Sequence, residues 1–230
     1  MDINDLLYSS MADTLENEAE NIIISSTESF EEILLKDYNG ILKEIPFLST
    51  VCSIYKIGRT VSEIHHLKQL YAFIEGIRNS TALRTDKEKY INKLKEYDVR
   101  TRNRELEYIV LITSKYINDG KPKLLAKLYV AFLEERCTWD EFMAFSEILD
   151  RFLPGDVETL EKGNHDKVRN EDASASLIRL SSMGIFYSQQ EDSFVDNYPG
   201  ILHISTNTIK NYYLTDFGAK MRFSLGFDKV

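Results

Sequence analysis

The apolar spacing of the chain changes from a helical to a strand-like period in its last quarter, and this change constrains the fold more than any other feature. Leu177 and Leu180 have the spacing of one helix face, and Gly184 follows them where a helix would end. Strand-like alternation comes next, in residues 185–187, 201–204 and 209–214. Thr215 then has the side chain of a helix N-cap. The segment predicts a helix over 173–183, a β-hairpin with a further strand, and a terminal helix.

This order of residues resembles the winged-helix half of MarR- and PadR-type regulators. Those families have leucines on a recognition helix, then Gly with an apolar pair that opens the wing, and then Tyr-x-Leu-Thr-x-x-Gly at the start of the next helix. The corresponding residues here are Leu177, Leu180, Gly184, Ile185, Phe186, Tyr212 or Tyr213, Leu214, Thr215 and Gly218. The resemblance implies a winged-helix-like α+β subdomain over residues 168–230.

The residues before this segment have the pattern of packed α-helices. Apolar side chains recur at three- and four-residue steps from Phe47 to Ile77, with Pro46 ahead of them and Gly58 placed to bend or split the helix. Capping-box sequences, in which a Ser or Thr cap precedes Glu, occur at Ser25–Glu28, Thr85–Glu88 and Thr138–Glu141. Helices joined by short turns are typical of a bundle, so we predict a mostly α fold with a helical bundle over residues 25–160.

The beginning of the chain is set apart by its charge. Residues 1–35 contain nine of the 37 acidic residues and none of the 28 basic ones, which equals the whole formal net charge of −9. We expect residues 1–24 to form a loosely held acidic helix or arm, whose field would suit a basic surface on a partner. The polar, turn-rich run over 161–172 predicts the other domain boundary.

A basic segment lies in the middle of the chain. Residues 78–104 contain nine basic and four acidic residues, and Arg78, Arg84 and Lys87 are candidate contacts to a partner or to DNA. The segment is also suited to pair with the acidic arm, either within one molecule or across a homodimer. A solvated helix face is the simpler interpretation of the same charges.

The segment that resembles a recognition helix carries little positive charge. Residues 172–182 contain one base, Arg179, and residues 168–230 contain six bases against seven acids. Binding to duplex DNA needs a clear positive footprint, so the resemblance is better evidence for the fold than for DNA binding. Arg179 and Lys210 are the candidate contacts of this region, to a protein partner or to DNA.

The sequence presents no complete catalytic constellation. Gly163–Asp166 matches the GNHD element of calcineurin-like metallophosphoesterases, but the Asp-x-His and Gly-His-x-His elements that complete that site are missing. Adjacent helical side chains point about 100° apart, so His65 and His66 do not readily share a metal, and we expect one to pack and the other to be exposed. Cys52 and Cys137 are expected to be buried, reduced thiols. We expect no metal and no cofactor.

The composition fits a folded globular protein, with 43% hydrophobic and 28% charged residues. The first 20 residues lack the basic and apolar regions of a signal peptide, and no apolar run reaches the ~18 residues of a membrane helix. The sequence predicts a non-enzymatic cytoplasmic interaction or regulatory protein of bacterial or phage origin, which binds a protein partner and no membrane. The alternative is a dimeric winged-helix transcription regulator that binds DNA.

Overall fold

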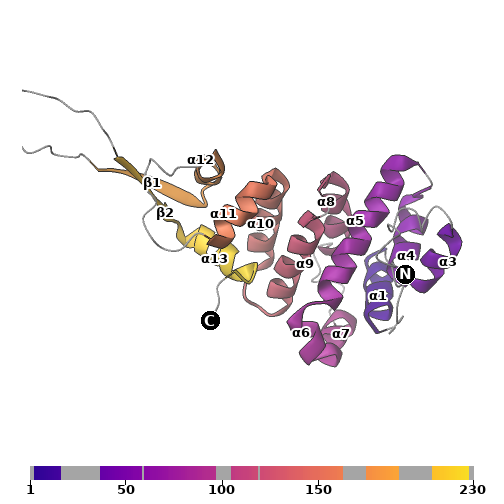
Figure 1. Cartoon of the computed structure of the whole chain (residues 1–230). Coiled ribbons are helices and arrows are strands. Elements are labelled where there is room, and N and C mark those ends of the chain that lie inside the picture. The colour runs from indigo at the N-terminus through magenta and orange to yellow at the C-terminus, as the bar shows by residue number, and fades with distance from the viewer. Residues whose placement is uncertain are drawn as a thin grey trace, which may run out of the picture. The chain divides into compact units, whose positions relative to one another are not determined.

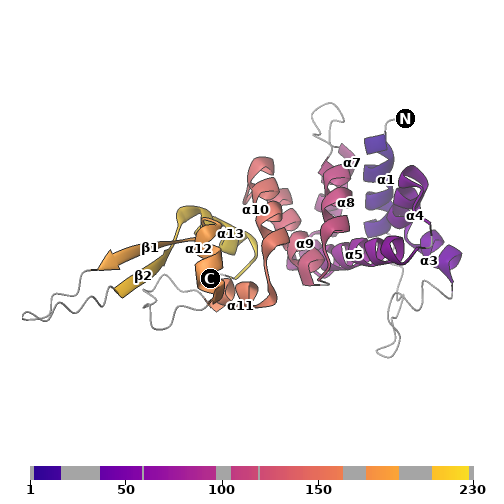
Figure 2. The same cartoon turned by 90° about the horizontal axis from the view of Figure 1, so that it is seen from above.

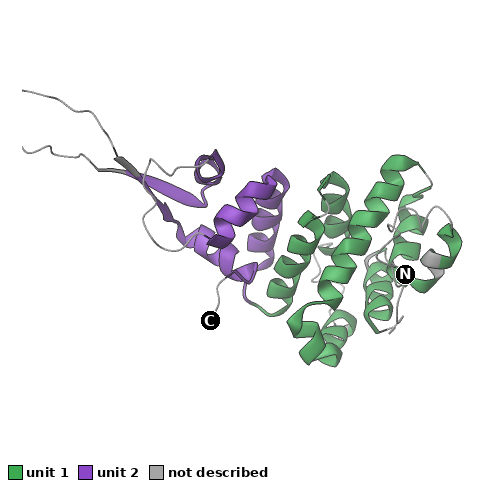
Figure 3. Cartoon of the chain, in the orientation of Figure 1, with its two compact units in different colours: residues 1–135 green, residues 136–230 purple. Residues whose placement is uncertain are grey.

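The computed structural model describes residues 3–16, 37–58, 60–96, 105–118, 120–162, 175–191 and 209–227 (Figure 1). Within these ranges the chain is mostly helical, with one two-stranded antiparallel sheet, which confirms the predicted fold class at this level. The chain forms two compact units, unit 1 over Met1–Glu135 and unit 2 over Arg136–Val230 (Figure 3). Among the described helices, none has both the length and the apolar character that crossing a membrane requires.

Unit 1 is built from helices. These are α1 (Ile3–Glu16), α3 (Tyr38–Glu44), α4 (Pro46–Tyr55), α5 (Val61–Arg78), α6 (Thr81–Thr85), α7 (Lys87–Glu96), α8 (Glu105–Lys115) and α9 (Gly120–Leu133). The largest fully buried side chains of this unit are Leu7, Met11, Ile45, Phe47, Leu48, Phe73, Tyr116 and Tyr129. Helix α5 packs against α9 and α8, whereas α1 lies between α4 and the pair α7 and α8 (Figure 2).

The apolar stretch from Phe47 to Ile77 forms two helices, and the break falls beside Gly58 as the sequence allows. Pro46 occupies the first turn of α4, and Lys56 ends that helix in the left-handed conformation. A capping box of Thr60 and Glu63 then starts α5, because each of the two residues satisfies a backbone amide that the helix leaves unbonded.

Helices α5 and α9 approach each other closely at Gly76. A Cβ atom on this residue would lie 2.7 Å from the Cβ of Ala126, which is nearer than side chains normally come. The rings of Phe73 and Tyr129 pack between the same two helices, with centroids 5.8 Å apart. Gly76 is therefore needed for packing rather than for a turn.

Helix α1 differs from the loosely held arm that its charge suggests. One face of this helix is fully buried in unit 1, through Leu7, Tyr8, Met11, Ala12 and Leu15. Because the acidic residues occupy other positions, the apolar stripe packs against α4, α7 and α8 while Asp13 and Glu16 stay exposed. The predicted helix start at Ser25 and the rest of the acidic arm lie outside the described residues.

Two predicted capping boxes have different outcomes. Thr138 and Glu141 form a complete box at the start of α10 (Trp139–Arg151), as predicted. The box predicted at Thr85 is wrong, because Thr85 is the last residue of α6. The side chain of Asp86 instead accepts a hydrogen bond from the Lys89 amide at the start of α7.

Unit 2 continues with α11 (Pro154–Lys162), α12 (Ala175–Ser182), β1 (Phe186–Glu191), β2 (Ile209–Leu214) and α13 (Asp216–Ser224). The strands pair antiparallel, with Phe186 opposite Leu214 and Glu191 opposite Ile209. The helix predicted over 173–183, the strand predicted over 209–214 and the helix predicted after Thr215 are found. The strand predicted over 201–204 lies outside the described residues.

Helices α10 and α11, which the sequence analysis placed with the bundle over 25–160, belong to the same compact unit as α13. The ring of Phe145 on α10 lies 5.0 Å from that of Phe217 on α13, and Lys220 forms an ion pair with Glu141. Both contacts join α10 to α13 across more than seventy positions of sequence, so the spacing of residues along the chain gives no sign of them. The predicted boundary over 161–172 falls almost wholly outside the described residues.

Candidate functional site

Helix α12 turns an uncharged surface away from the core. Leu177 and Leu180 are buried, whereas Ile178 between them is 55% exposed. Ala175 and Ser182 are exposed at helical spacing from Ile178, so the outer stripe of α12 is small, apolar or hydroxylated. A stripe of this kind offers no charge to a phosphate and favours contact with an apolar surface.

The predicted contact residue Arg179 is held by an acid on the neighbouring helix. Its guanidinium donates to both carboxylate oxygens of Asp156, at 2.6 Å and 3.2 Å. Burial raises the pKa of Asp156, but hydrogen bonds from Arg179, the Leu153 amide and Ser176 outweigh burial and hold that pKa below its ordinary value. Arg179 therefore neutralises a buried carboxylate inside unit 2.

The ribbon of β1 and β2 carries a stacked aromatic pair, of which one ring is exposed. The rings of Tyr187 and Tyr213 are directly opposite each other and stack, with centroids 5.3 Å apart and planes 23° apart. Tyr187 is 50% exposed, so the pair presents an aromatic face to its surroundings. Lys210, a predicted contact, lies on β2 opposite Gln190, and its side chain is outside the described part of the chain.

The first residues of α13 dock on the end of α12. The Thr215 hydroxyl caps α13 by accepting from the Gly218 amide, and it also donates toward the Gly184 and Ile185 carbonyls. The Thr215 amide donates to the Ile185 carbonyl at 2.9 Å. A Cβ atom on Gly218 would lie 2.2 Å from the Ile185 oxygen, so the chain needs a glycine at this position. The four residues form one junction, which we call the glycine junction.

Three bases of unit 1 meet at the C-terminal end of α1, and we call Arg78, Lys87 and Lys95 the α1 clamp. Arg78 donates to the Thr14 carbonyl, and Lys87 donates to the Glu16 carbonyl at 3.1 Å. Lys95 forms an ion pair with the Glu16 side chain. The clamp satisfies carbonyls that a helix end leaves unbonded and places positive charge at the negative end of the helix dipole. Of the alternatives that the sequence leaves open, pairing of an acid with a base within one molecule occurs for Glu16 and Lys95, whereas Arg78 and Lys87 bind backbone carbonyls of α1.

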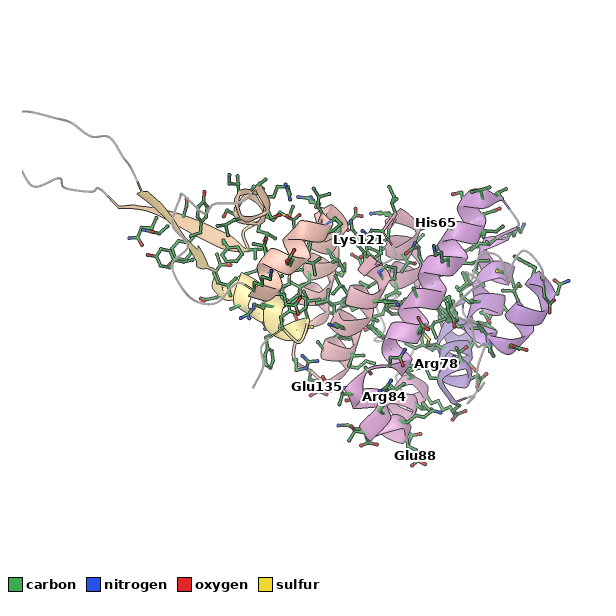
Figure 4. The ribbon with its side chains drawn as sticks, viewed as in Figure 1. His65, Arg78, Arg84, Glu88, Lys121 and Glu135 are labelled. Atoms are coloured by element: carbon green, nitrogen blue, oxygen red, sulfur yellow. The ribbon has the colours of Figure 1, made fainter. Side chains whose placement is uncertain are left out.

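The other bases of the segment from 78 to 96 also have partners inside unit 1. Arg84, a predicted contact, donates to the Asn79 side chain at 2.9 Å. Lys93 donates to the Leu133 carbonyl at the end of α9 and to Glu135, and Lys89 lies over the Tyr90 ring. Figure 4 places Arg78 and Arg84 toward one end of α5 and His65 toward the other. Arg100, Arg102 and Arg104 are outside the described residues.

Unit 2 uses bases in the same way. Arg222 is buried and donates to the Leu160 and Glu161 carbonyls at the end of α11. Arg136 donates to the Phe223 carbonyl at the end of α13 and lies over the ring of that residue. In both units, therefore, basic side chains from one element stabilise the C-terminal end of another.

The adjacent histidines of α5 both bind carbonyls, so the expectation that one packs and the other is exposed is wrong. His65 Nε2 lies 3.0 Å from the Tyr116 oxygen, and His66 Nε2 lies 2.9 Å from the Val110 oxygen. Both histidines are half-buried. Burial lowers the pKa of His66, the hydrogen bond to Val110 raises it by less, and the neighbouring His65 lowers it further. His66 joins α5 to α8, and His65 joins α5 to the residue that follows α8, so both Nε2 atoms have a carbonyl partner.

The described residues offer little for metal or thiol chemistry. Within these ranges, no three His, Cys, Asp or Glu side chains are grouped as metal ligands would be. Cys52 and Cys137 are buried free thiols, and burial raises the pKa of each. The GNHD element over 163–166 lies outside the described residues.

Comparison of the chain with protein-family models, curated proteins and solved structures finds no match. The candidate site is therefore argued from its geometry alone. Sequence reasoning missed Asp156 as the partner of Arg179, and it missed Ile178 and Tyr187 as exposed residues. The signal for Ile178 was its position between two core leucines, where helical geometry turns a side chain outward.

Proposed function

We propose that the protein is a non-enzymatic interaction or regulatory protein whose unit 2 docks on a protein partner. The observation that carries this proposal is the exposure of uncharged side chains on two consecutive elements, Ile178 on α12 and Tyr187 on the ribbon, where Tyr187 stacks on the part-buried Tyr213. The centres of protein interfaces are rich in aromatic and apolar residues and poor in charge. The proposal keeps the expectation of a cytoplasmic protein of bacterial or phage origin.

We further infer that α11, α12, the ribbon and α13 form a winged-helix-like module. The glycine junction supports this inference, because Thr215 and Gly218 contact Gly184 and Ile185, which are the two parts of the motif shared with MarR- and PadR-type regulators. The order of helix, antiparallel ribbon and helix also matches the order of recognition helix, wing and following helix. In this module, α12 and the ribbon are the docking elements.

A dimeric regulator that binds DNA is the alternative, and it has less support. The base of α12, Arg179, neutralises Asp156, and the described bases of the segment from 78 to 96 have partners inside unit 1. A side chain already paired in this way must give up its partner before it can neutralise a phosphate. Binding of a protein partner therefore accounts better than DNA binding for two observations: the exposed side chains of unit 2 are uncharged, and the described bases already have partners.

The test is affinity capture from lysate of the native host, with and without nuclease, using the wild-type chain and single variants. Ile178→Asp and Tyr187→Asp place a charge on the proposed docking face. Ile117→Asp is the matched control, because Ile117 is 87% exposed and belongs to unit 1. We expect the wild type and the control to retain a partner that the two unit 2 variants lose, since an anchor side chain contributes about 2 kcal/mol, or roughly thirtyfold in affinity.

Two outcomes would contradict the proposal. Retention of the same partner by all four proteins would show that the face of α12 and the ribbon is not the docking surface. Recovery of DNA without nuclease, with every partner lost after nuclease treatment, would favour the DNA-binding alternative. Circular dichroism of each variant verifies that the substitutions leave the fold intact.

A further inference from the structure

Helix α1 binds to the rest of unit 1 as an amphipathic helix binds in a groove. The buried positions of α1 recur at three- and four-residue steps, from Leu7 to Leu15, and contact α4, α7 and α8 (Figure 2). We call the surface of these three helices that α1 covers the α1 groove. Helix-in-groove binding of this kind is also a common mode of recognition between separate chains.

Specific polar contacts fix the direction and register of α1 in the groove. The Tyr8 hydroxyl donates to Glu105 at 2.8 Å near the middle of the helix. The Thr14 hydroxyl accepts from the Phe47 amide at 2.8 Å, and the α1 clamp holds the end of the helix through the Thr14 and Glu16 carbonyls. The groove is therefore complementary to α1 in the spacing of its apolar positions and in the side chains of Tyr8 and Thr14, and the clamp binds the end of the helix.

The connection that follows α1 is long. Twenty residues, 17–36, separate Glu16 from Asp37, and twenty residues can span up to roughly 66 Å when extended. The contacts described above between α1 and its groove use residues outside this connection. An α1 helix supplied by another molecule would therefore make the same contacts in the same groove.

We propose that the α1 groove accepts α1 from a second copy of the chain, so that two copies exchange this helix. The exchanged and closed forms share their contacts, and their balance depends on protein concentration and on the length of the connection. A second copy fits the groove because its α1 carries every complementary group: the apolar stripe, Tyr8, Thr14 and the Glu16 carboxylate. This interaction is independent of the docking surface proposed for unit 2.

The first experiment supplies α1 in trans to a full-length chain whose own α1 is disabled. Met11→Asp places a charge at a fully buried position of α1, and a fluorescent peptide of residues 1–16 is titrated into this variant. We expect saturable binding by fluorescence anisotropy, and binding at least roughly thirtyfold weaker for the same peptide carrying Met11→Asp. If the variant is unfolded alone, recovery of its helical circular dichroism on addition of peptide supports the proposal. A folded variant that ignores the peptide, or an unfolded one that stays unfolded at saturating peptide, overturns it.

The second experiment changes the balance between the two forms. Deletion of residues 20–31 shortens the connection, and light scattering after size exclusion measures the mass of the full chain at several concentrations. We expect the dimer fraction to rise above that of the wild type, and Met11→Asp in the shortened chain to remove the dimer. A shortened chain that stays monomeric, or a dimer that survives Met11→Asp, counts against exchange of α1.

Discussion

Arg179 on α12 and Asp156 on α11 form a paired contact, in which Nη2 lies 2.6 Å from Oδ1 and Nε lies 3.2 Å from Oδ2. The Asp156 side chain is fully buried, and the Arg179 side chain is one-third exposed. Ser176 adds a hydrogen bond to the same guanidinium. The base that the sequence offers as a surface contact is thus the counterion of an interior acid, and it joins two consecutive helices of unit 2.

Replacement of this acid should destabilise unit 2. Asp156→Asn keeps the size of the side chain but removes the charge that Arg179 neutralises, and hydrogen bonds to charged groups contribute about 1.5–3 kcal/mol. We expect a fall of about 2 kcal/mol in the free energy of unfolding, measured by urea denaturation. Glu158→Gln on the same helix is the control, because Glu158 pairs with Lys162 at the surface. If the two substitutions lower the free energy of unfolding equally, the pair with Arg179 contributes no more than a surface ion pair.

Gly218 should not tolerate even a methyl group. Its missing Cβ would lie 2.2 Å from the Ile185 oxygen, so alanine must push α13 away from the end of α12. Overpacking of this kind costs about 1–3 kcal/mol, and the cost should lie near the upper end because the clash is with a backbone oxygen; it then outweighs the ~1 kcal/mol that alanine gains over glycine in a helix. Thermal unfolding of Gly218→Ala should therefore give a lower midpoint than the wild type. Gly58→Ala is the comparison, because its Cβ would meet its nearest neighbour, Glu63, at an ordinary 3.4 Å.

Much of the local structure follows from short stretches of sequence. The capping box of Thr138 and Glu141, the cap at Thr215 and the strand over 209–214 depend on neighbouring residues, so the sequence alone identifies them. The box predicted at Thr85 fails for a local reason. Thr85 and Asp86 are adjacent, and either could cap the next helix. Because Thr85 is the last residue of α6, Asp86 is the one that caps α7.

The partners of the charged residues could not be predicted in the same way. Arg78 and Lys87 reach backbone carbonyls of α1 that lie 64 and 71 positions away in the sequence, and every residue carries such a carbonyl. The charge pattern identifies the bases but contains no signal for acceptors of this kind. The packing of α1 has a similar explanation, because acidic residues are interspersed in the sequence with the five apolar positions that form its buried stripe. The candidate site therefore required the tertiary fold.

His66 should make the stability of unit 1 depend on pH. Burial lowers the pKa of folded His66 below the ordinary value of about 6.5, so the unfolded chain binds a proton more readily than the folded chain. The free energy of unfolding should fall as the pH drops through about 6.5, by at most ~1.4 kcal/mol per pH unit for one group, until the folded pKa is reached. Urea denaturation between pH 5 and pH 7.5 measures this slope. His66→Gln should flatten it, and parallel curves for the two proteins would contradict the assignment.

Arg222 should be the most sensitive of the bases that stabilise helix ends. It is buried, its Nε donates to the Leu160 carbonyl at 3.0 Å, and one Nη reaches the Glu161 carbonyl at 3.2 Å. Arg222→Met keeps the apolar stem but leaves these carbonyls without their donors, and we expect a loss of about 3 kcal/mol in the free energy of unfolding. Arg222→Lys should recover part of the loss, because one ammonium replaces only part of the planar fork. Hydrogen exchange should show the loosening first in the last turn of α11. Arg136→Met, at the more exposed end of α13, is the control, and equal stability of Arg222→Met and the wild type would refute the role given to this residue.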